Sequence, residues 1–144
     1  MIHVLMDNPV AQVTYHKKQA VLYVEWKREA TLEEYQRVLI ECLEFGRINP
    51  FDSFISDIRR QEKLHAENRK WFEAEILPIA IHELSLKRSV IIHHETNEQK
   101  VYVEKLQVAA RRNHFILKSF NEPGEAFKWL RSLRLKIREF LFKA

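Results

Sequence analysis

Glycine is scarce in this chain of 144 residues, which has only Gly46 and Gly124. Phosphate-binding loops of the G-x-G-x-x-G and G-x-x-x-x-G-K-[ST] types need several glycines close together, so the sequence contains neither. It also lacks a G-x-S-x-G turn, in which α/β-hydrolases hold a nucleophilic serine. These absences argue against nucleotide binding through a glycine-rich loop and against that kind of covalent catalysis.

Cysteine is scarcer still, since Cys42 is the only one. No disulfide can form within the chain, and no C-x-x-C motif is present to hold zinc. Cys42 falls on the apolar stripe of an expected helix, which favours a buried and unreactive thiol. This use of cysteine suits the cytosol, and we expect a cytoplasmic protein.

Long apolar runs are also missing. The longest uninterrupted apolar runs are short, such as residues 76–81, whereas a bilayer-spanning helix needs about 20 apolar residues. The first ten residues have no basic start, apolar centre or cleavage site of a secretory signal. With 46% hydrophobic and 31% charged residues, the chain has the composition of a folded domain. We expect residues 1–144 to form a single domain that is not inserted in a membrane.

Charge is abundant but mixed in sign. The net charge is +4, and most basic residues alternate with acidic ones along expected helices. Proteins that bind nucleic acid usually concentrate basic residues on one face, so we expect no nucleic-acid partner.

Alternating apolar residues indicate two strands at the start of the chain. Residues 12–15 and 21–26 fit strands joined by the polar loop of residues 16–19, and so short a connection implies an antiparallel hairpin. Capping-box patterns beginning at Thr31 and Thr96 predict two helix starts, and Gly46 is expected to end the first helix. The remaining elements are expected as strands at 51–57, 88–94 and 114–120 and helices at about 66–84, 96–113 and 125–142, with a kink or break at Pro78.

This order predicts an α/β fold. Repeated β-α alternation favours parallel strands joined by right-handed crossovers. The expected architecture is therefore a single mixed five-stranded sheet, with an N-terminal antiparallel hairpin followed by right-handed β-α units.

Four segments carry a resemblance to a known family. They are VTYHKKQAVLYVEWKREATLEEY, FISDIRR, ENRKWFEAEILPIAIHELSLKRSVIIHH and EPGEAFKWLRSL. Together they resemble the bacterial SpoIIAA-like group over roughly residues 10–133, a group similar in fold to STAS domains (anti-sigma-factor antagonists) and to the CRAL-TRIO lipid-binding fold. The resemblance implies a small non-enzymatic regulatory or protein-interaction module. The similarity to the CRAL-TRIO fold implies an alternative function, a carrier of a small apolar or amphipathic ligand. Trp71 and Phe72 would supply aromatic surface for that ligand, and the kink at Pro78 would open a cavity for it.

The phosphorylation switch of STAS antagonists has no matching residue here. The family places a serine or threonine at the start of the helix after the third strand, where a phosphate changes partner binding. This chain has no serine or threonine from Asp57 through Leu84. Ser53 and Ser56 fall within the expected strand, where a kinase would not reach them. We therefore expect a module without the family switch.

The carboxyl ends of the third and fourth expected strands carry polar residues. Asp57, Arg59, Arg60, His93 and His94 would meet there, at the edge where open α/β sheets bind ligands. One interpretation is an anion-tolerant ligand site, with arginine as a bidentate donor. The other is an ion pair of Asp57 with Arg59 or Arg60 that holds a loop, beside two solvated histidines.

Metal binding is not expected despite seven histidines. They follow no H-E-x-x-H or other ligand spacing, and a zinc site needs three or four converging ligands. We expect no metal and no cofactor.

The last helix is unusually apolar and basic. Its apolar stripe comprises Phe127, Leu130, Leu133, Ile137, Phe140 and Leu141. Beyond about Leu133 it is expected to outrun the sheet, leaving Leu133, Ile137, Phe140 and Leu141 to contact something else. The options are a second subunit as a homodimer, a protein partner or an anionic membrane surface, with self-association favoured because closed homo-oligomers are common. The alternative is that the helix only covers the core of its own domain.

Overall fold

The computed structural model describes the backbone of residues 2–143 and the side chains of residues 2–141, and its centre is a sheet of six strands. The strands are β1 (Ile2–Asp7), β2 (Ala11–His16), β3 (Val21–Trp26), β4 (Ser53–Asp57), β5 (Arg88–Ile92) and β6 (Ile116–Phe120). They lie in chain order across the sheet, from β1 at one edge to β6 at the other. β1, β2 and β3 are antiparallel, whereas β3 to β6 run parallel. The expected mixed α/β sheet is confirmed.

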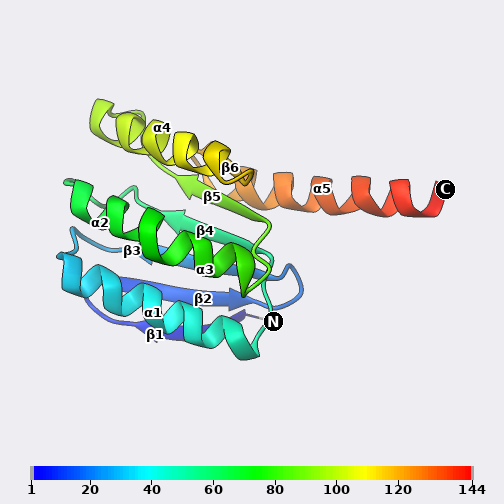
Figure 1. Cartoon of the computed structure of the whole chain (residues 1–144), viewed down its shortest axis with the longest axis horizontal. Coiled ribbons are helices and arrows are strands. Elements are labelled where there is room, and N and C mark those ends of the chain that lie inside the picture. The colour runs from blue at the N-terminus through cyan, green and yellow to red at the C-terminus, as the bar shows by residue number, and fades with distance from the viewer. Residues whose placement is uncertain (1, 144) are drawn as a thin grey trace.

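Helices cover the sheet unequally (Figure 1). They are α1 (Leu32–Ile48), α2 (Ala66–Trp71), the π-helical segment η1 (Phe72–Ile76), α3 (Leu77–His82), α4 (Asn97–Arg112) and α5 (Pro123–Lys143). The helices that connect the parallel strands pack on one face and form the larger hydrophobic core. α5 packs on the opposite face and forms a smaller core with β3, β4 and β5.

The prediction of five strands is wrong, because β1 adds a sixth. β1 pairs with β2 at the sheet edge, after a turn in which the Asn8 side chain accepts from the N–H groups of Val10 and Ala11. Ile2 and Val4 are more than half exposed. The backbone pairing therefore holds a strand that lacks a buried side-chain pattern of its own.

Both faces of β3 are covered, as the sequence predicts. Leu22 and Val24 are fully buried in the larger core, and Val21 is fully buried beneath α5. β3 also forms the boundary between the antiparallel and parallel parts of the sheet, since it pairs antiparallel with β2 and parallel with β4.

The two expected capping boxes differ. Thr31 and Glu34 exchange both hydrogen bonds at the start of α1. At α4, Thr96 accepts from the Gln99 N–H, but the Gln99 side chain bonds the backbone of Ile58 and His94 instead of closing the box. Gln99 therefore ties α4 to the ends of β4 and β5.

Gly46 does not end its helix, because α1 continues to Ile48. A Cβ atom at Gly46 would lie 2.7 Å from the ring of Phe51. The glycine thus serves close packing between α1 and the start of the next strand.

Pro78 divides the second helical region, as expected. The region consists of α2, η1 and α3, and Pro78 lies in the first turn of α3. Just before it, the Leu77 N–H donates to the Phe72 carbonyl, five residues back. This wider turn fits the missing N–H and the bulk of the proline ring.

α5 packs on the sheet only along its first half. Ala126 and Leu130 are buried, and Arg134 donates to Asp52 Oδ1 at 3.0 Å and to the Lys18 carbonyl at 3.4 Å. The described side chains beyond Arg134 are all exposed, and Figure 1 shows this half of the helix projecting past the sheet. We call residues 135–143 the α5 tail. No helix in the described part of the chain is both long and apolar enough to span a membrane.

Candidate functional site

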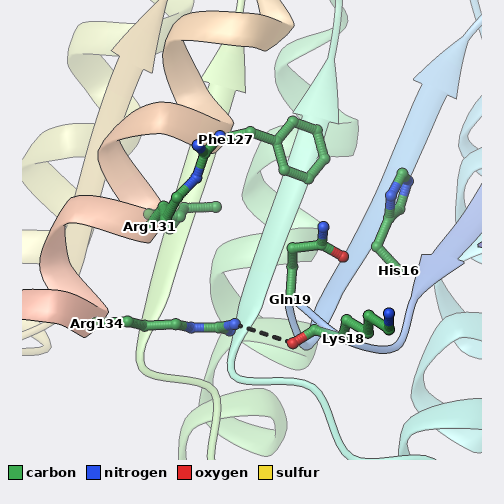
Figure 2. Close-up of a pocket in the computed structure, with 7 residues that line it drawn as sticks. His16, Lys18, Gln19, Phe127, Arg131 and Arg134 are labelled. Carbon is green, nitrogen blue, oxygen red and sulfur yellow. Dashed lines mark hydrogen bonds between the residues drawn. The ribbon is translucent and has the colours of Figure 1, made fainter. Parts of the chain in front are cut away.

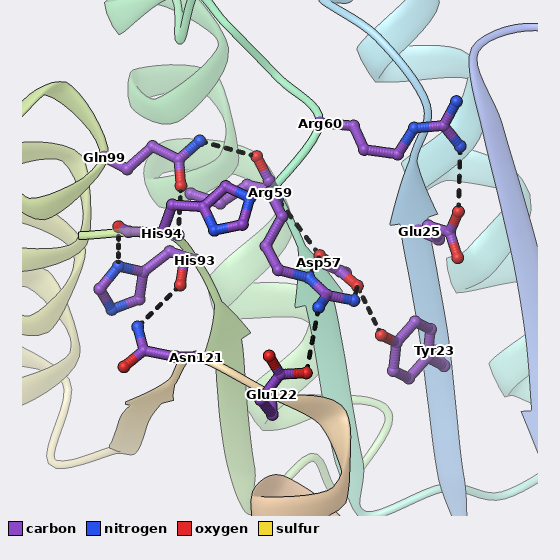
Figure 3. Close-up of polar contacts among 11 residues, drawn as sticks. Tyr23, Glu25, Asp57, Arg59, Arg60, His93, His94, Gln99, Asn121 and Glu122 are labelled. Atoms are coloured by element: carbon purple, nitrogen blue, oxygen red, sulfur yellow. Dashed lines mark hydrogen bonds and ion pairs between the residues drawn. The ribbon is translucent and has the colours of Figure 1, made fainter. Parts of the chain in front are cut away.

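Asp57 is the centre of the polar rim at the ends of the parallel strands (Figure 3). It is the last residue of β4, and its side chain is only 3% exposed. Arg59 donates to it from Nε at 3.0 Å and from Nη2 at 2.9 Å, and the Arg59 N–H donates to Oδ1. The ion pair that the sequence offered as one interpretation is therefore present, in bidentate form.

Tyr23 completes this cluster, and the sequence analysis did not identify it. Its hydroxyl donates to Asp57 Oδ2 at 2.6 Å, across the β3–β4 pair. Burial, and then this hydrogen bond, raise the pKa of Tyr23 far above its usual value. Tyr23 therefore stays protonated and remains a donor to the carboxylate. The only sequence signal was its position on the same face of β3 as Val21.

Arg59 is held almost entirely by acidic groups. The hydrogen bonds to Asp57 raise its pKa above the ordinary arginine value, and its Nη1 also lies 3.4 Å from Glu122 at the start of α5. The guanidinium is thus already engaged on two sides.

Arg60 belongs to a different contact. Its Nη1 lies 3.3 Å from Glu25 Oε1 on β3, where the Arg60 side chain is exposed and the Glu25 side chain is half-buried. Arg60 therefore does not join Asp57, although the two residues are close in sequence.

The histidines form a second group, and the prediction that both are solvated is wrong for His93. His93 is only 6% exposed. Its backbone N–H donates to the Phe120 carbonyl of β6, and its ring Nδ1 donates to the His94 carbonyl at 2.7 Å. Asn121 in turn donates to the His93 carbonyl. His94 is exposed, as expected, and its backbone N–H donates to the Gln99 side chain.

The rim therefore consists of contacts that satisfy one another. Asp57, Tyr23 and Arg59 form one cluster, while His93 and Asn121 tie β5 to the loop after β6. Among the residues that the structure describes, no group of three His, Cys, Asp or Glu side chains could hold a metal ion. The geometry supports the structural interpretation, and ligand binding here stays a prediction.

The α5 tail carries the other candidate residues. Leu133, at its base, is half-buried, whereas Ile137, Phe140 and Leu141 are 49%, 76% and 64% exposed. The expectation that α5 outruns the sheet is confirmed. Its first half covers the core of its own domain, but the alternative that the helix does only this does not describe the exposed tail. What the tail contacts stays a prediction.

Comparison with known proteins finds a structural counterpart. No protein-family model matches the sequence, and no curated protein matches it. The fold matches the crystal structure of an uncharacterized protein from the DUF3478 family with a SpoIIAA-like fold, from Shewanella loihica, with a TM-score of 0.52. The match covers 90% of this chain and 92% of that one, at 20% sequence identity. This chain has a SpoIIAA-like fold.

No serine or threonine lies between Asp57 and Leu84, so none stands at the start of the helix after β4, and the absence of the family switch stays a prediction. The helix after β4 begins with His65 as its N-cap. Ser53 is fully buried in β4, and Ser56 accepts a hydrogen bond from Trp26 Nε1 at 3.1 Å. Both serines are thus engaged within the sheet.

The interior of this SpoIIAA-like domain is closely packed near Pro78. The two core cavities that Phe72 lines have volumes of about 20 Å³ each. Such a volume holds about one water molecule. Neither cavity is lined by Trp71 or Pro78, so they do not form the opening expected there, and the carrier alternative stays a prediction.

Cys42 is inert, as its position on the helix stripe predicted. It is 4% exposed, and burial raises the pKa of its thiol to about 12. The thiolate needed for reaction is thus not populated near neutral pH.

Proposed function

We propose that this protein is a non-enzymatic interaction module that forms a homodimer through the α5 tail. The observation that carries the proposal is the exposure of Ile137, Phe140 and Leu141 on a helix that leaves the body of the domain. A contiguous apolar surface on a projecting helix is typical of a protein-protein contact.

The spacing of the apolar residues favours packing against another helix. Ala126, Leu130, Leu133, Ile137 and Phe140 follow one another at alternating intervals of four and three residues. This is the 3.5-residue period of helices that pack side by side. The first two residues of this seam are buried on the sheet, and the last two are exposed. The seam therefore continues beyond its own domain.

A second copy of the chain is the favoured partner. Two identical tails related by a twofold axis present the same seam to each other. Dimers with this symmetry are the commonest homo-oligomers. The tail is about 13 Å long, from nine residues at 1.5 Å each. A contact of that length buries less area than a standard interface, so the dimer should be of modest affinity.

Sedimentation velocity across a concentration series tests the proposal. We expect a monomer-dimer equilibrium that Ile137→Glu and Phe140→Glu each weaken at least tenfold, because either carboxylate would be buried in the apolar seam. Leu135→Glu is the matched control, since Leu135 is 53% exposed on the same helix but lies off the seam. Truncation after Arg134 should give a monomer while keeping the contact of Arg134 with Asp52.

Salt separates a homodimer from an anionic membrane as the partner. The tail contains three basic residues and one acidic residue, so two tails repel each other weakly. Added salt screens this repulsion and should strengthen the dimer, whereas it would weaken binding to anionic vesicles. A wild-type chain that stays monomeric at high concentration in both low and high salt contradicts the proposal.

The proposal assigns neither catalysis nor an interior ligand. The polar groups of the rim already bond one another, and the core cavities near Phe72 hold about one water molecule. The two cavities lined by Phe72 therefore give no support to the alternative of a carrier with an internal apolar ligand. The buried Cys42 thiol is consistent with placement in the cytoplasm.

A further inference from the structure

A surface pocket lies between α5 and the β2–β3 hairpin (Figure 2). Its volume is about 500 Å³, which is within the range of small-molecule sites. The hairpin side contributes His16, Lys18 and Gln19, and the helix side contributes Phe127, Arg131 and Arg134. None of these residues belongs to the rim or to the α5 tail.

The charge of the pocket has one sign. Lys18, Arg131 and Arg134 line it, and no acidic residue does. Asp52, just outside, contacts Arg134 at 3.0 Å and Arg88 at 3.5 Å. One carboxylate between two guanidinium groups leaves an excess of positive charge next to the pocket.

Arg88 adds an independent observation. It is 6% exposed, yet its Nε has no hydrogen-bond partner among the described residues. A buried guanidinium that shares the Asp52 carboxylate with Arg134 is incompletely neutralised. An anion bound nearby would lower the electrostatic cost of this cluster.

Arg134 is already fixed in position. It donates from Nη2 to Asp52 Oδ1 and from Nη1 to the Lys18 carbonyl, which joins the two walls of the pocket (Figure 2). A guanidinium held in this way loses little conformational entropy when it meets an anion. The pocket is therefore partly preorganised.

The other side of the pocket is aromatic. The Phe127 ring lies parallel to Tyr23 at 6.2 Å and is 5.1 Å from the His16 ring. Burial lowers the pKa of His16, so its ring is neutral at pH 7. Phe127 and His16 thus offer a flat, uncharged surface beside the three cations.

We propose that this pocket binds a small soluble organic anion, a phosphate or carboxylate carried on a flat apolar group. The anion lies among Lys18, Arg131 and Arg134, and the apolar group lies against Phe127 and His16. The tail of a second copy is a poor occupant, because its excess of basic residues would meet a basic pocket. The proposal does not depend on dimer formation.

Isothermal titration calorimetry of the full chain with phenyl phosphate tests this site. We expect one site per chain, with inorganic phosphate and phenol each binding at least tenfold more weakly, because each supplies only half of the contacts. Lys18→Gln and Arg131→Gln should each weaken phenyl phosphate about tenfold. Lys128→Gln and Arg138→Gln are the controls, since both residues are exposed bases of α5 outside the pocket, and binding should be unchanged.

Three outcomes would overturn the proposal. The first is no heat of binding with phenyl phosphate or benzoate, and the second is equal weakening by the pocket and control variants. The third is binding to vesicles that contain phosphatidic acid without binding to any soluble anion, which would assign the charge to a membrane surface. Chemical shifts of the Gln19 and Phe127 amides that move on titration would place the ligand in the pocket independently of affinity.

Discussion

Replacing Tyr23 with phenylalanine tests whether the polar rim is structural. The substitution removes only the hydroxyl that donates to Asp57 at 2.6 Å, and the ring keeps its place parallel to Phe127. The Asp57 side chain is 3% exposed, so water cannot readily replace the lost donor. Hydrogen bonds to charged groups contribute about 1.5–3 kcal/mol. We expect Tyr23→Phe to lower the free energy of unfolding by about 2 kcal/mol.

Tyr15→Phe is the matched control. Its hydroxyl donates to the neutral Pro50 carbonyl at 2.8 Å, for which a loss of about 1 kcal/mol is expected. Urea unfolding followed by circular dichroism measures both, and the m-values should stay equal to that of the wild type. If Tyr23→Phe costs less than Tyr15→Phe, the Asp57 carboxylate is not locked in the fold. The rim would then regain the role of a ligand site.

Two further predictions concern packing and pH. Gly46→Ala should lower the free energy of unfolding, measured with urea, by about 1 kcal/mol, because the clash of a Cβ lying 2.7 Å from the Phe51 ring outweighs the better helix propensity of alanine. Gly124→Ala is the control and should not destabilise the protein, since a Cβ there would have nothing within 4 Å. Burial raises the pKa of Tyr35 in the folded state well above its usual value. Above about pH 10 the unfolded state therefore loses this proton before the folded state does. The free energy of unfolding is unaffected by this group below about pH 10 and falls above it. Urea midpoints between pH 9 and 11 should therefore fall less steeply for Tyr35→Phe, and equal slopes would contradict this reasoning.

The sequence predicted the elements whose signal is local. β3 and β5 contain short apolar runs that are buried on both faces, and α1 begins at a complete capping box at Thr31. These patterns depend on residues within a few positions of one another, so they can be recognised without the fold.

What the sequence missed depends on distant partners. β1 is held by pairing with β2 and not by a buried side-chain pattern, since Ile2 and Val4 are exposed. The hydrogen bond between Tyr23 and Asp57 joins residues 34 positions apart, and the register of β3 against β4 creates it. His93 is buried by β6 and its loop, which no pattern near residue 93 indicates.

The basic pocket was missed for the same reason. Lys18 and Arg134 meet only because α5 crosses the sheet towards the β2–β3 hairpin, so that Arg134 reaches the Lys18 carbonyl. The sequence analysis treated the basic residues of α5 as one set. The structure separates Arg131 and Arg134, which line the pocket, from Lys128, which is exposed outside it, and from the basic residues of the exposed tail.

The tail itself is the strongest physical reason to expect a partner. It extends an existing helix, so no nucleation is needed, but each added residue of an isolated helix gains little free energy in water. Ile137 and Phe140 gain little burial from their own domain, because they are 49% and 76% exposed. Burial of one such side chain contributes about 1.5–3 kcal/mol. Covering the seam would therefore turn a marginal helix into a stable one, and a second copy with the same unsatisfied seam is the partner that is always present.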